Sequence, residues 1–165
     1  MIIAVVGQSG KISRKLERVA YEVGKEIAKR KAILVCGGRN EGIMDAVARG
    51  AYENNGITVG IMPESDKSRT SRFIKIPILT GMGFARNQII ALSCDAMIIV
   101  GGGIGTLTEV AYAYAFGKPL IYIEGTGGLI KNYVGKYMDN KKIVKIIKAG
   151  NAREAVELAF KLAKK

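Results

Sequence analysis

Several short apolar segments in this chain each end in a glycine-rich turn and then lead into a helical pattern. The segments are continuous rather than alternating, so both faces of each expected strand must be covered. Buried strands that alternate with helices are typical of a doubly wound α/β sheet. The sequence therefore predicts a Rossmann-like, mostly parallel sheet with helices on both faces. Strands are expected at 2–6, 32–36, 57–61, 73–79, 96–100, 120–123 and about 143–147.

The segments between these strands carry apolar residues at intervals of three and four, the period of an amphipathic helix. Ser13 and Asn151 are predicted to cap the first and last helices, because their side-chain oxygens can accept from free N–H groups. Pro77 marks 73–79 as an edge strand, since proline cannot donate to a central ladder. Helices are expected after Ser13, at 43–52, 84–94, 106–116, about 129–138, and from Ala152.

Length and composition predict a single domain over residues 1–165. A chain of 165 residues can bury a full core, and 48% of its residues are hydrophobic while 24% are charged. No apolar run is long enough to cross a bilayer, and the first residues lack the basic flank of a signal peptide. We therefore expect a cytoplasmic protein without membrane contact. Abundant Lys, Ile and Glu without Trp or His indicate a thermophilic source.

The amino-acid content excludes several chemistries. The chain has no histidine, and its two cysteines, Cys36 and Cys94, do not form a CxxC pair. Sites with His ligands and Ser-His or Cys-His nucleophiles are therefore excluded, and no metal site is expected. Carboxylates, Lys, Arg, Tyr and backbone N–H groups remain as functional groups. No resident cofactor is required by any motif.

The net charge of +12 favours anionic partners without specifying one. The basic residues are spread along the chain, with mild clusters at 25–31 and 141–148. No basic groove studded with aromatic residues is visible, which disfavours single-stranded nucleic acid. The charge is better explained by a solvated lysine-rich surface together with a phosphate site.

The strongest local signal is the turn Gly101-Gly102-Gly103-Ile104-Gly105-Thr106, which joins an expected strand to an expected helix. Glycines allow the backbone to approach a phosphate closely, and the first N–H groups of a helix lack internal partners. The helix dipole adds favourable charge at the same place. We therefore predict that Gly102, Gly103, Ile104, Gly105 and Thr106 bind the phosphate of a nucleotide-like ligand, with Thr106 capping the helix or donating its hydroxyl.

Two further turns follow the first and second expected strands. Gly7 and Ser9 belong to the first turn, and Gly37, Gly38 and Arg39 to the second. In a parallel sheet these turns share one edge, so all five residues are predicted to line the ligand site. The first turn is not GxGxxG, and no acidic residue ends the second strand. An ordinary NAD-binding fold is therefore disfavoured.

Two charged residues complete the expected site. Glu109 lies one turn into the helix after the glycines, where its carboxylate can reach ligand hydroxyls beyond the helix end. Arg86 begins the preceding helix, where a cation is unfavourable unless an anion binds nearby. If the protein is an enzyme, Arg86 and Glu109 are the expected catalytic residues.

Together these motifs resemble the LONELY GUY proteins, often called lysine decarboxylase-like, over residues 1–125. Their superfamily also includes the DNA-processing protein DprA and the molybdenum cofactor carrier protein. The resemblance implies hydrolysis of nucleoside 5′-monophosphates, with Glu109 at the ribose and Arg86 stabilising charge. The motifs that carry this resemblance are Gly37-Gly38, Gly42-Ile43-Met44, Gly56–Pro63, Arg86 and Gly102–Thr106 with Glu109.

Two positions depart from the phosphoribohydrolase motif, which has Pro-Gly-Gly and an Arg-Lys pair. Gly101 replaces the Pro and Asn87 replaces the Lys. Both resemble the molybdenum cofactor carrier branch, which implies binding without catalysis. We therefore expect a homo-oligomeric carrier, a dimer or tetramer, whose ligand is a nucleotide-like or pterin compound such as the molybdenum cofactor. A nucleoside 5′-monophosphate phosphoribohydrolase is the first alternative, and a DprA-like DNA-binding protein is the second.

Overall fold

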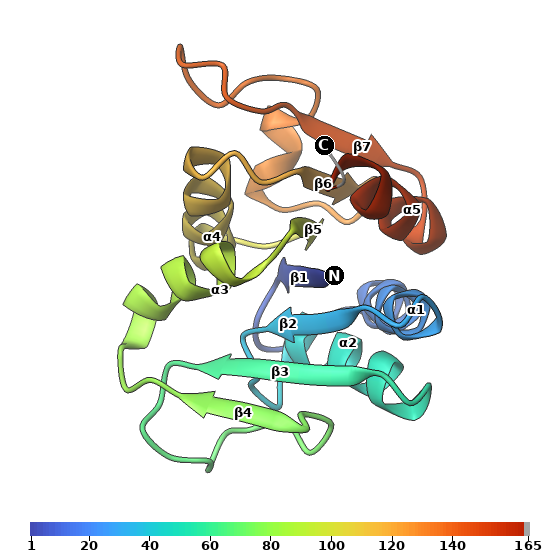
Figure 1. Cartoon of the computed structure of the whole chain (residues 1–165), viewed down its shortest axis with the longest axis vertical. Coiled ribbons are helices and arrows are strands. Elements are labelled where there is room, and N and C mark those ends of the chain that lie inside the picture. The colour runs from blue at the N-terminus through green and yellow to red at the C-terminus, as the bar shows by residue number, and fades with distance from the viewer. Residues whose placement is uncertain (164–165) are drawn as a thin grey trace.

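A computed structural model describes residues 1–163 and contains one seven-stranded sheet. All neighbouring strands are parallel, in the order β4-β3-β2-β1-β5-β6-β7 (Figure 1). The Rossmann-like α/β class expected from the sequence is therefore confirmed. The strands are β1 (Ile2–Gly7), β2 (Ile33–Cys36), β3 (Ile57–Met62), β4 (Ile76–Leu79), β5 (Ala96–Val100), β6 (Leu120–Ile123) and β7 (Ile146–Ala149).

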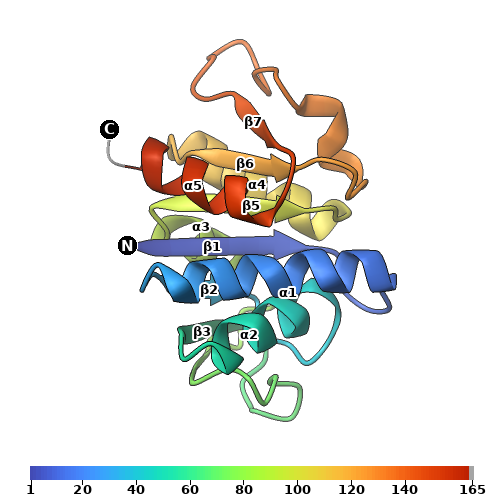
Figure 2. The same cartoon turned by 90° about the vertical axis from the view of Figure 1, so that its right-hand side faces the viewer.

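Helices cover both faces of this sheet. In Figure 1, α1, α2 and α5 lie on one side of the strands, and α3 and α4 on the other; Figure 2 shows α1, α2 and α5 from their own side. The α-helices are α1 (Arg14–Lys29), α2 (Gly42–Glu53), α3 (Asn87–Ser93), α4 (Ile104–Ala115) and α5 (Ala152–Leu162), and the 3-10 helices are η1 (Gly83–Arg86) and η2 (Leu129–Tyr133).

The core consists of two apolar layers, one on each face of the sheet. In β1, Ile3 and Val5 pack with α1, α2 and α5, whereas Ala4 and Val6 pack with α3 and α4. Alternate side chains of a strand point to opposite faces, so an uninterrupted apolar strand fills both layers at once. This is the physical reason for the continuous apolar segments in the sequence.

Strand order reverses between β1 and β5. From β1 the chain builds outward through β2, β3 and β4, and it then returns to place β5 on the other side of β1. At such a reversal the connections after β1 and β5 leave toward opposite faces, which opens a crevice beyond the strand ends. The turns after these two strands are the glycine-rich segments that begin at Gly7 and Gly101.

The caps predicted for the first and last helices are confirmed. The Ser13 side chain accepts a hydrogen bond from the N–H of Leu16, and the Asn151 side chain accepts one from Glu154. Within residues 1–163, no helix combines the length and apolar character needed to cross a membrane.

Several predicted boundaries are wrong. The strand predicted at 73–79 begins only at Ile76, although its place at the sheet edge is confirmed. The helix predicted at 84–94 divides into η1 and α3, and the one predicted from Thr106 begins at Ile104 with Gly103 as its N-cap. Thr106 therefore lies inside the first turn and does not cap it.

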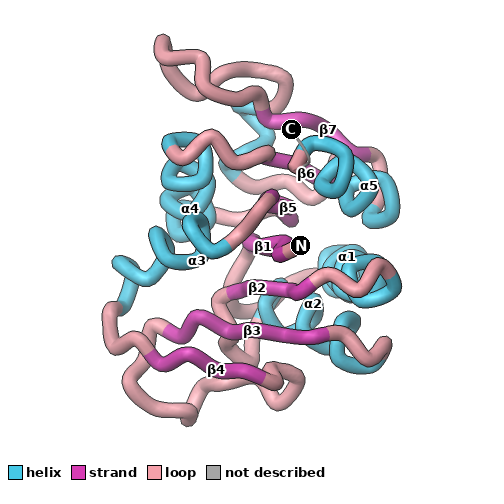
Figure 3. The backbone as a smooth tube through the Cα atoms, viewed as in Figure 1, coloured by secondary structure: helices cyan, strands magenta, loops and turns pink. Residues whose placement is uncertain are grey.

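The region after β6 differs most from the prediction. Instead of a helix over 129–138 there is only the short η2, followed by loop up to β7, which begins at Ile146 rather than about 143 (Figure 3). Val134 is extended and forms an isolated bridge with Ile146, and the N–H of Gly135 donates to the carbonyl of Ile146 at 2.8 Å. Pairing with β7 thus replaces the helical period at these residues.

Candidate functional site

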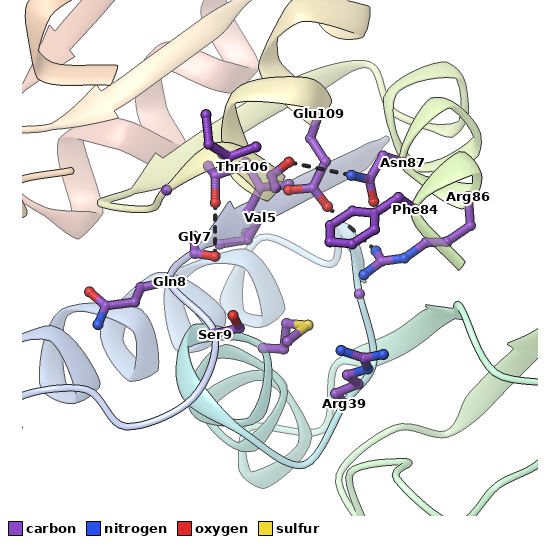
Figure 4. Close-up of a pocket in the computed structure, with 16 residues that line it drawn as sticks. Val5, Gly7, Gln8, Ser9, Arg39, Phe84, Arg86, Asn87, Thr106 and Glu109 are labelled. Atoms are coloured by element: carbon purple, nitrogen blue, oxygen red, sulfur yellow. Dashed lines mark hydrogen bonds and ion pairs between the residues drawn. The ribbon is translucent and has the colours of Figure 1, made fainter. Parts of the chain in front are cut away.

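A cavity of about 300 Å³ lies at the crevice between the ends of β1 and β5. Its walls come from the turn after β1, the start of α4, the end of β2 and the η1–α3 segment (Figure 4). Segments far apart in the sequence therefore meet at the place where doubly wound sheets bind their ligands. Its lining includes most of the predicted site residues: Gly7, Ser9, Gly37, Arg39, Arg86, Gly103, Ile104, Gly105, Thr106 and Glu109.

Two predicted residues do not line the cavity. Gly38 packs against Gly60 and Met62, and its carbonyl accepts from the N–H of Ser71. Gly102 faces the side chain of Thr106, and its carbonyl accepts from the N–H of Leu129 at 2.9 Å. Both glycines shape the turns from behind, and direct ligand contact by either stays a prediction.

The start of α4 presents free backbone donors to the cavity. The first intrahelical bond runs from the N–H of Leu107 to the carbonyl of Gly103 at 2.9 Å. The N–H groups of Ile104, Gly105 and Thr106 precede this bond, so no carbonyl within the helix is available to accept from them. A β-carbon added at Gly103 would meet nothing within 4 Å, so open space lies beside these donors.

Hydrogen bonds fix the glycine turn from both sides. The Thr106 hydroxyl donates to the carbonyl of Gly7 at 2.9 Å, which ties α4 to the end of β1. The N–H of Gly101 donates to Thr126 Oγ1 at 3.0 Å, and that hydroxyl donates to the carbonyl of Ile123. Because the single hydroxyl proton of Thr106 is already donated, its backbone N–H is the group left for a ligand.

Arg86 and Glu109 form a buried pair at the wall of the cavity. Their exposed fractions are 8% and 7%, and Arg86 Nη1 lies 3.4 Å from Glu109 Oε1. Burial raises the pKa of Glu109 to about 7, and the positive charge of Arg86 opposes that rise. Burial also lowers the pKa of Arg86. The carboxyl group therefore changes protonation near neutral pH.

The guanidinium of Arg86 is poorly satisfied. It carries five N–H donors, but its one side-chain partner is Glu109, at a long 3.4 Å, and its buried Nε has no partner within the described residues. Arg39 behaves differently, because its guanidinium contacts Glu64 Oε1 at 2.6 Å. Of the two arginines at the cavity, Arg86 has the greater capacity left for a ligand acceptor.

Asn87, the residue that replaces the motif lysine, is bonded within the protein. Its exposed fraction is 2%, and its Nδ2 donates to Thr108 Oγ1 at 2.7 Å and to the carbonyl of Gly105 at 3.3 Å. The side chain thus joins α3 to α4. It supplies neither positive charge nor a free donor to the cavity.

Besides Asn87, the cavity is lined by five residues that the sequence did not mark as site residues: Val5, Val6, Gln8, Met44 and Phe84. Gln8 lies between the predicted site residues Gly7 and Ser9, and Phe84 lies two residues before Arg86, so their positions carried a usable signal. Met44 belongs to the Gly42-Ile43-Met44 motif of the family resemblance, but its place in the site was not expected, because an apolar residue on a helix is ordinarily explained by the core.

Comparison with known proteins places the chain in a family. The profile of the SLOG cluster4 family, also described as LDcluster4, matches residues 1–156. This chain belongs to the SLOG cluster4 family. A cytokinin riboside 5′-monophosphate phosphoribohydrolase of Mycobacterium tuberculosis is 33% identical over 133 residues, which cover 76% of this chain and 71% of that protein. The resemblance drawn from the site motifs is therefore confirmed.

Solved structures that resemble the chain include molybdenum cofactor proteins. The molybdenum cofactor binding protein of Rippkaea orientalis is 34% identical, with a TM-score of 0.88 and coverage of 98% of this chain and 96% of that one. The molybdenum cofactor carrier protein of Chlamydomonas reinhardtii is 33% identical, with a TM-score of 0.86 and coverage of 99% and 98%. The chain therefore belongs to the SLOG cluster4 family and closely resembles the structures of a molybdenum cofactor binding protein and a carrier protein.

A more distant likeness concerns the fold alone. DNA processing protein A from Helicobacter pylori is 17% identical, with a TM-score of 0.69, and the match covers 99% of this chain and 80% of that one. This match shows a shared architecture only.

Proposed function

We propose that this SLOG cluster4 protein binds and carries a phosphorylated, nucleotide-like or pterin ligand, of which the molybdenum cofactor is one example. The observation that carries the proposal is the start of α4, where free N–H groups face an open cavity at the strand reversal. A phosphate held there receives several backbone donors and the positive end of the helix dipole.

The part of the cavity wall formed by Arg86 and Glu109 suits the remainder of such a ligand. Arg86 offers N–H donors to ring or sugar oxygens, and Glu109 offers carboxylate oxygens to hydroxyl groups. Arg86 and Glu109 are only 8% and 7% exposed, so these contacts lie away from bulk water. Hydrogen bonds to charged groups are stronger in such a buried site than in water. The pair therefore orients the ligand after the phosphate has been captured.

Two features of the site favour carriage over hydrolysis. Gly101 has a φ of +64°, a conformation that proline cannot adopt, so the turn differs from one built on Pro-Gly-Gly. Asn87 is bonded within the protein and cannot supply the charge of the motif lysine. The carrier proteins among the structural neighbours agree with this interpretation.

Gly103 offers a direct test of the phosphate site. Asp at this N-cap position should stabilise α4 but repel phosphate, because its negative charge would lie beside the anion site. We expect Gly103→Asp to fold normally and to lose AMP binding in calorimetry, while Gly103→Asn, a neutral cap of the same shape, retains it. Wild-type protein should bind AMP far more tightly than adenosine. Equal affinity for AMP and adenosine would refute the proposal.

A phosphoribohydrolase remains a second candidate, and one observation favours it. Glu109 has a pKa of about 7 beside Arg86, and a carboxyl group that titrates near neutral pH can act as a general acid or base. A 33% identical relative bears the name of this activity. Adenine release from AMP separates the two candidates.

We also propose a homo-oligomer, a dimer or tetramer. On the outer side of α3 and α4, Leu92 and Tyr112 are 51% and 37% exposed, more apolar surface than a solvated helix face requires. Burying these side chains in a symmetric interface would remove that surface from water. Light scattering at micromolar concentration should give a multiple of the chain mass, and a monomeric mass would contradict the proposal.

A further inference from the structure

Phe84 lies at the rim of the candidate site with most of its side chain in solvent. It belongs to η1 and is 78% exposed, the highest value among the large hydrophobic residues of the described chain. The next highest is Ile104 at 67%, which borders the same cavity from α4. Single exposed apolar residues are ordinary, but the two most exposed ones border one cavity. This coincidence requires an explanation.

A second, smaller cavity adjoins the first at this point. Its volume is about 140 Å³, and its walls include Phe84, Arg86, Gly83 and Pro63. Phe84 and Arg86 also line the main cavity, so the phenyl ring stands where the two spaces meet. Figure 4 shows the ring of Phe84 on the same side of the site as Arg86 and Asn87, across from Gly7 and Thr106.

We propose that Phe84 is a specificity-determining residue whose ring stacks on the planar heterocycle of the ligand. The inference rests on the proposed function, because it takes the phosphate to lie at the start of α4. The ring of Phe84 lies close to that point, since a β-carbon added at Gly105 would meet Phe84 Cε1 at 3.5 Å. A base or pterin attached through a sugar or pyran then comes to the rim, where Phe84 and Ile104 offer apolar surface.

Stacking explains the exposure that core packing leaves unexplained. An aromatic face binds the π-face of a base with little dependence on its hydrogen-bonding edge. Phe84 would therefore select ligands that carry a flat ring over those that carry only a sugar phosphate. The ring-free compound ribose 5-phosphate should use the phosphate site without using Phe84.

The absence of tryptophan from the chain makes a direct test available. Phe84→Trp would be its only tryptophan. We expect AMP and GMP to quench the fluorescence of this residue, whereas ribose 5-phosphate should not. Tyr137→Trp is the matched control, because Tyr137 is a 39% exposed aromatic residue that lines neither cavity, and its fluorescence should not respond.

Affinities provide a second measurement with wild-type protein as reference. Phe84→Ala should weaken the binding of AMP and GMP by roughly tenfold or more, since stacking on one base is commonly worth that much. The affinity for ribose 5-phosphate should not change. Phe84→Tyr should retain wild-type affinity, and Tyr137→Ala should have no effect.

The outcomes distinguish the stacking role of Phe84 from the phosphate site on which it depends. If wild-type protein binds none of the three compounds, the phosphate site itself is wrong. If wild-type protein binds all three compounds and Phe84→Ala lowers none of the affinities, or lowers all three equally, Phe84 does not stack on the ligand. The phosphate site is then unaffected by this result. A change of oligomeric mass in Phe84→Ala without a ring-dependent loss of affinity would show that Phe84 serves a subunit contact instead.

Discussion

The guanidinium of Arg86 occupies the space that a side chain at Gly37 would need. A β-carbon at this position would lie 2.8 Å from Arg86 Nη2 and 2.9 Å from Nη1, closer than such atoms approach in proteins. Gly37 is predicted to bind the ligand, and it lines the main cavity. Its missing side chain also leaves the space in which Arg86 reaches Glu109.

Gly37→Ala should therefore weaken ligand binding without unfolding the protein. The crowded atoms are the ends of flexible side chains, Met44 and Arg86, so the cost in stability should be about 1–3 kcal/mol. A displaced Arg86 should lower AMP affinity roughly tenfold. Calorimetry together with thermal unfolding measures both effects.

Gly150→Ala is the control for this substitution, because it also crowds a flexible charged side chain, that of Glu154, but lies after β7 and away from the cavity. Equal AMP affinities for wild type and Gly37→Ala would show that Arg86 is not placed by Gly37.

Glu109 should impose a pH dependence on stability. Its folded pKa is about 7 because of burial, against an ordinary 4.5, so the folded state holds an additional proton between these values. The free energy of unfolding should therefore fall as pH rises from about 4.5 to 7, with little further contribution above that range. Glu109→Gln removes this term, so its stability relative to wild type should rise by about 1–3 kcal/mol over the same window.

Urea unfolding of both proteins at several pH values between 4.5 and 8 measures that difference. Glu124→Gln serves as the control for loss of a carboxylate, since Glu124 is exposed and paired with Lys148 at 3.1 Å. If the Glu109→Gln difference follows the same course as the Glu124→Gln difference, burial of Glu109 has no thermodynamic consequence.

Restoring the motif proline at position 101 should damage the protein rather than activate it. Gly101 has a φ of +64°, which proline cannot adopt, and its N–H donates to Thr126 Oγ1, a bond that proline cannot make. We expect Gly101→Pro to lose about 2–3 kcal/mol of stability, near the upper range for single substitutions. Gly101→Ala keeps the N–H and should lose less. Normal stability of Gly101→Pro by thermal unfolding would show that the turn readily adopts the proline-containing conformation.

Much of this fold could be predicted from the sequence, because its strongest patterns are local. The apolar strands and the turns that begin at Gly7, Gly37 and Gly101 each report their own structure, and a parallel sheet brings such turns to one edge. The positions of Arg86 and Glu109 at the site also followed from the expected helices. Their direct pairing did not, because it depends on the angle between α3 and α4.

The remaining errors arise where contacts between distant segments decide the structure. Residues 129–138 have helical spacing, but Val134 pairs with Ile146 and the N–H of Gly135 donates to the same residue. The exposure of Phe84 likewise depends on how η1 lies relative to α4. No pattern along the chain records either relationship.

Adenine release from AMP distinguishes a carrier from an enzyme. Release of the base from a nucleoside monophosphate passes through an oxocarbenium-like ribose and requires a carboxylate near the sugar and a well-placed water. Within residues 1–163, Glu109 is the one carboxylate that lines the main cavity. Asp45 accepts a hydrogen bond from Ser71, and Asp95 accepts one from the N–H of Ile2 at the opposite edge of the sheet.

With one carboxylate, no histidine and an internally bonded Asn87, we expect AMP to bind with little or no release of adenine. A misplacement of about 1 Å in a catalytic group can cost roughly a hundredfold in rate. Glu109→Gln should weaken AMP binding modestly and leave the fold intact. Chromatography of AMP incubated with the protein at the growth temperature of its source measures adenine directly, with Gly103→Asp as the binding-deficient control for contaminating hydrolases. Turnover of about 1 per second or faster that disappears in Glu109→Gln would establish the phosphoribohydrolase and exclude the passive carrier, since that rate is ordinary for an enzyme.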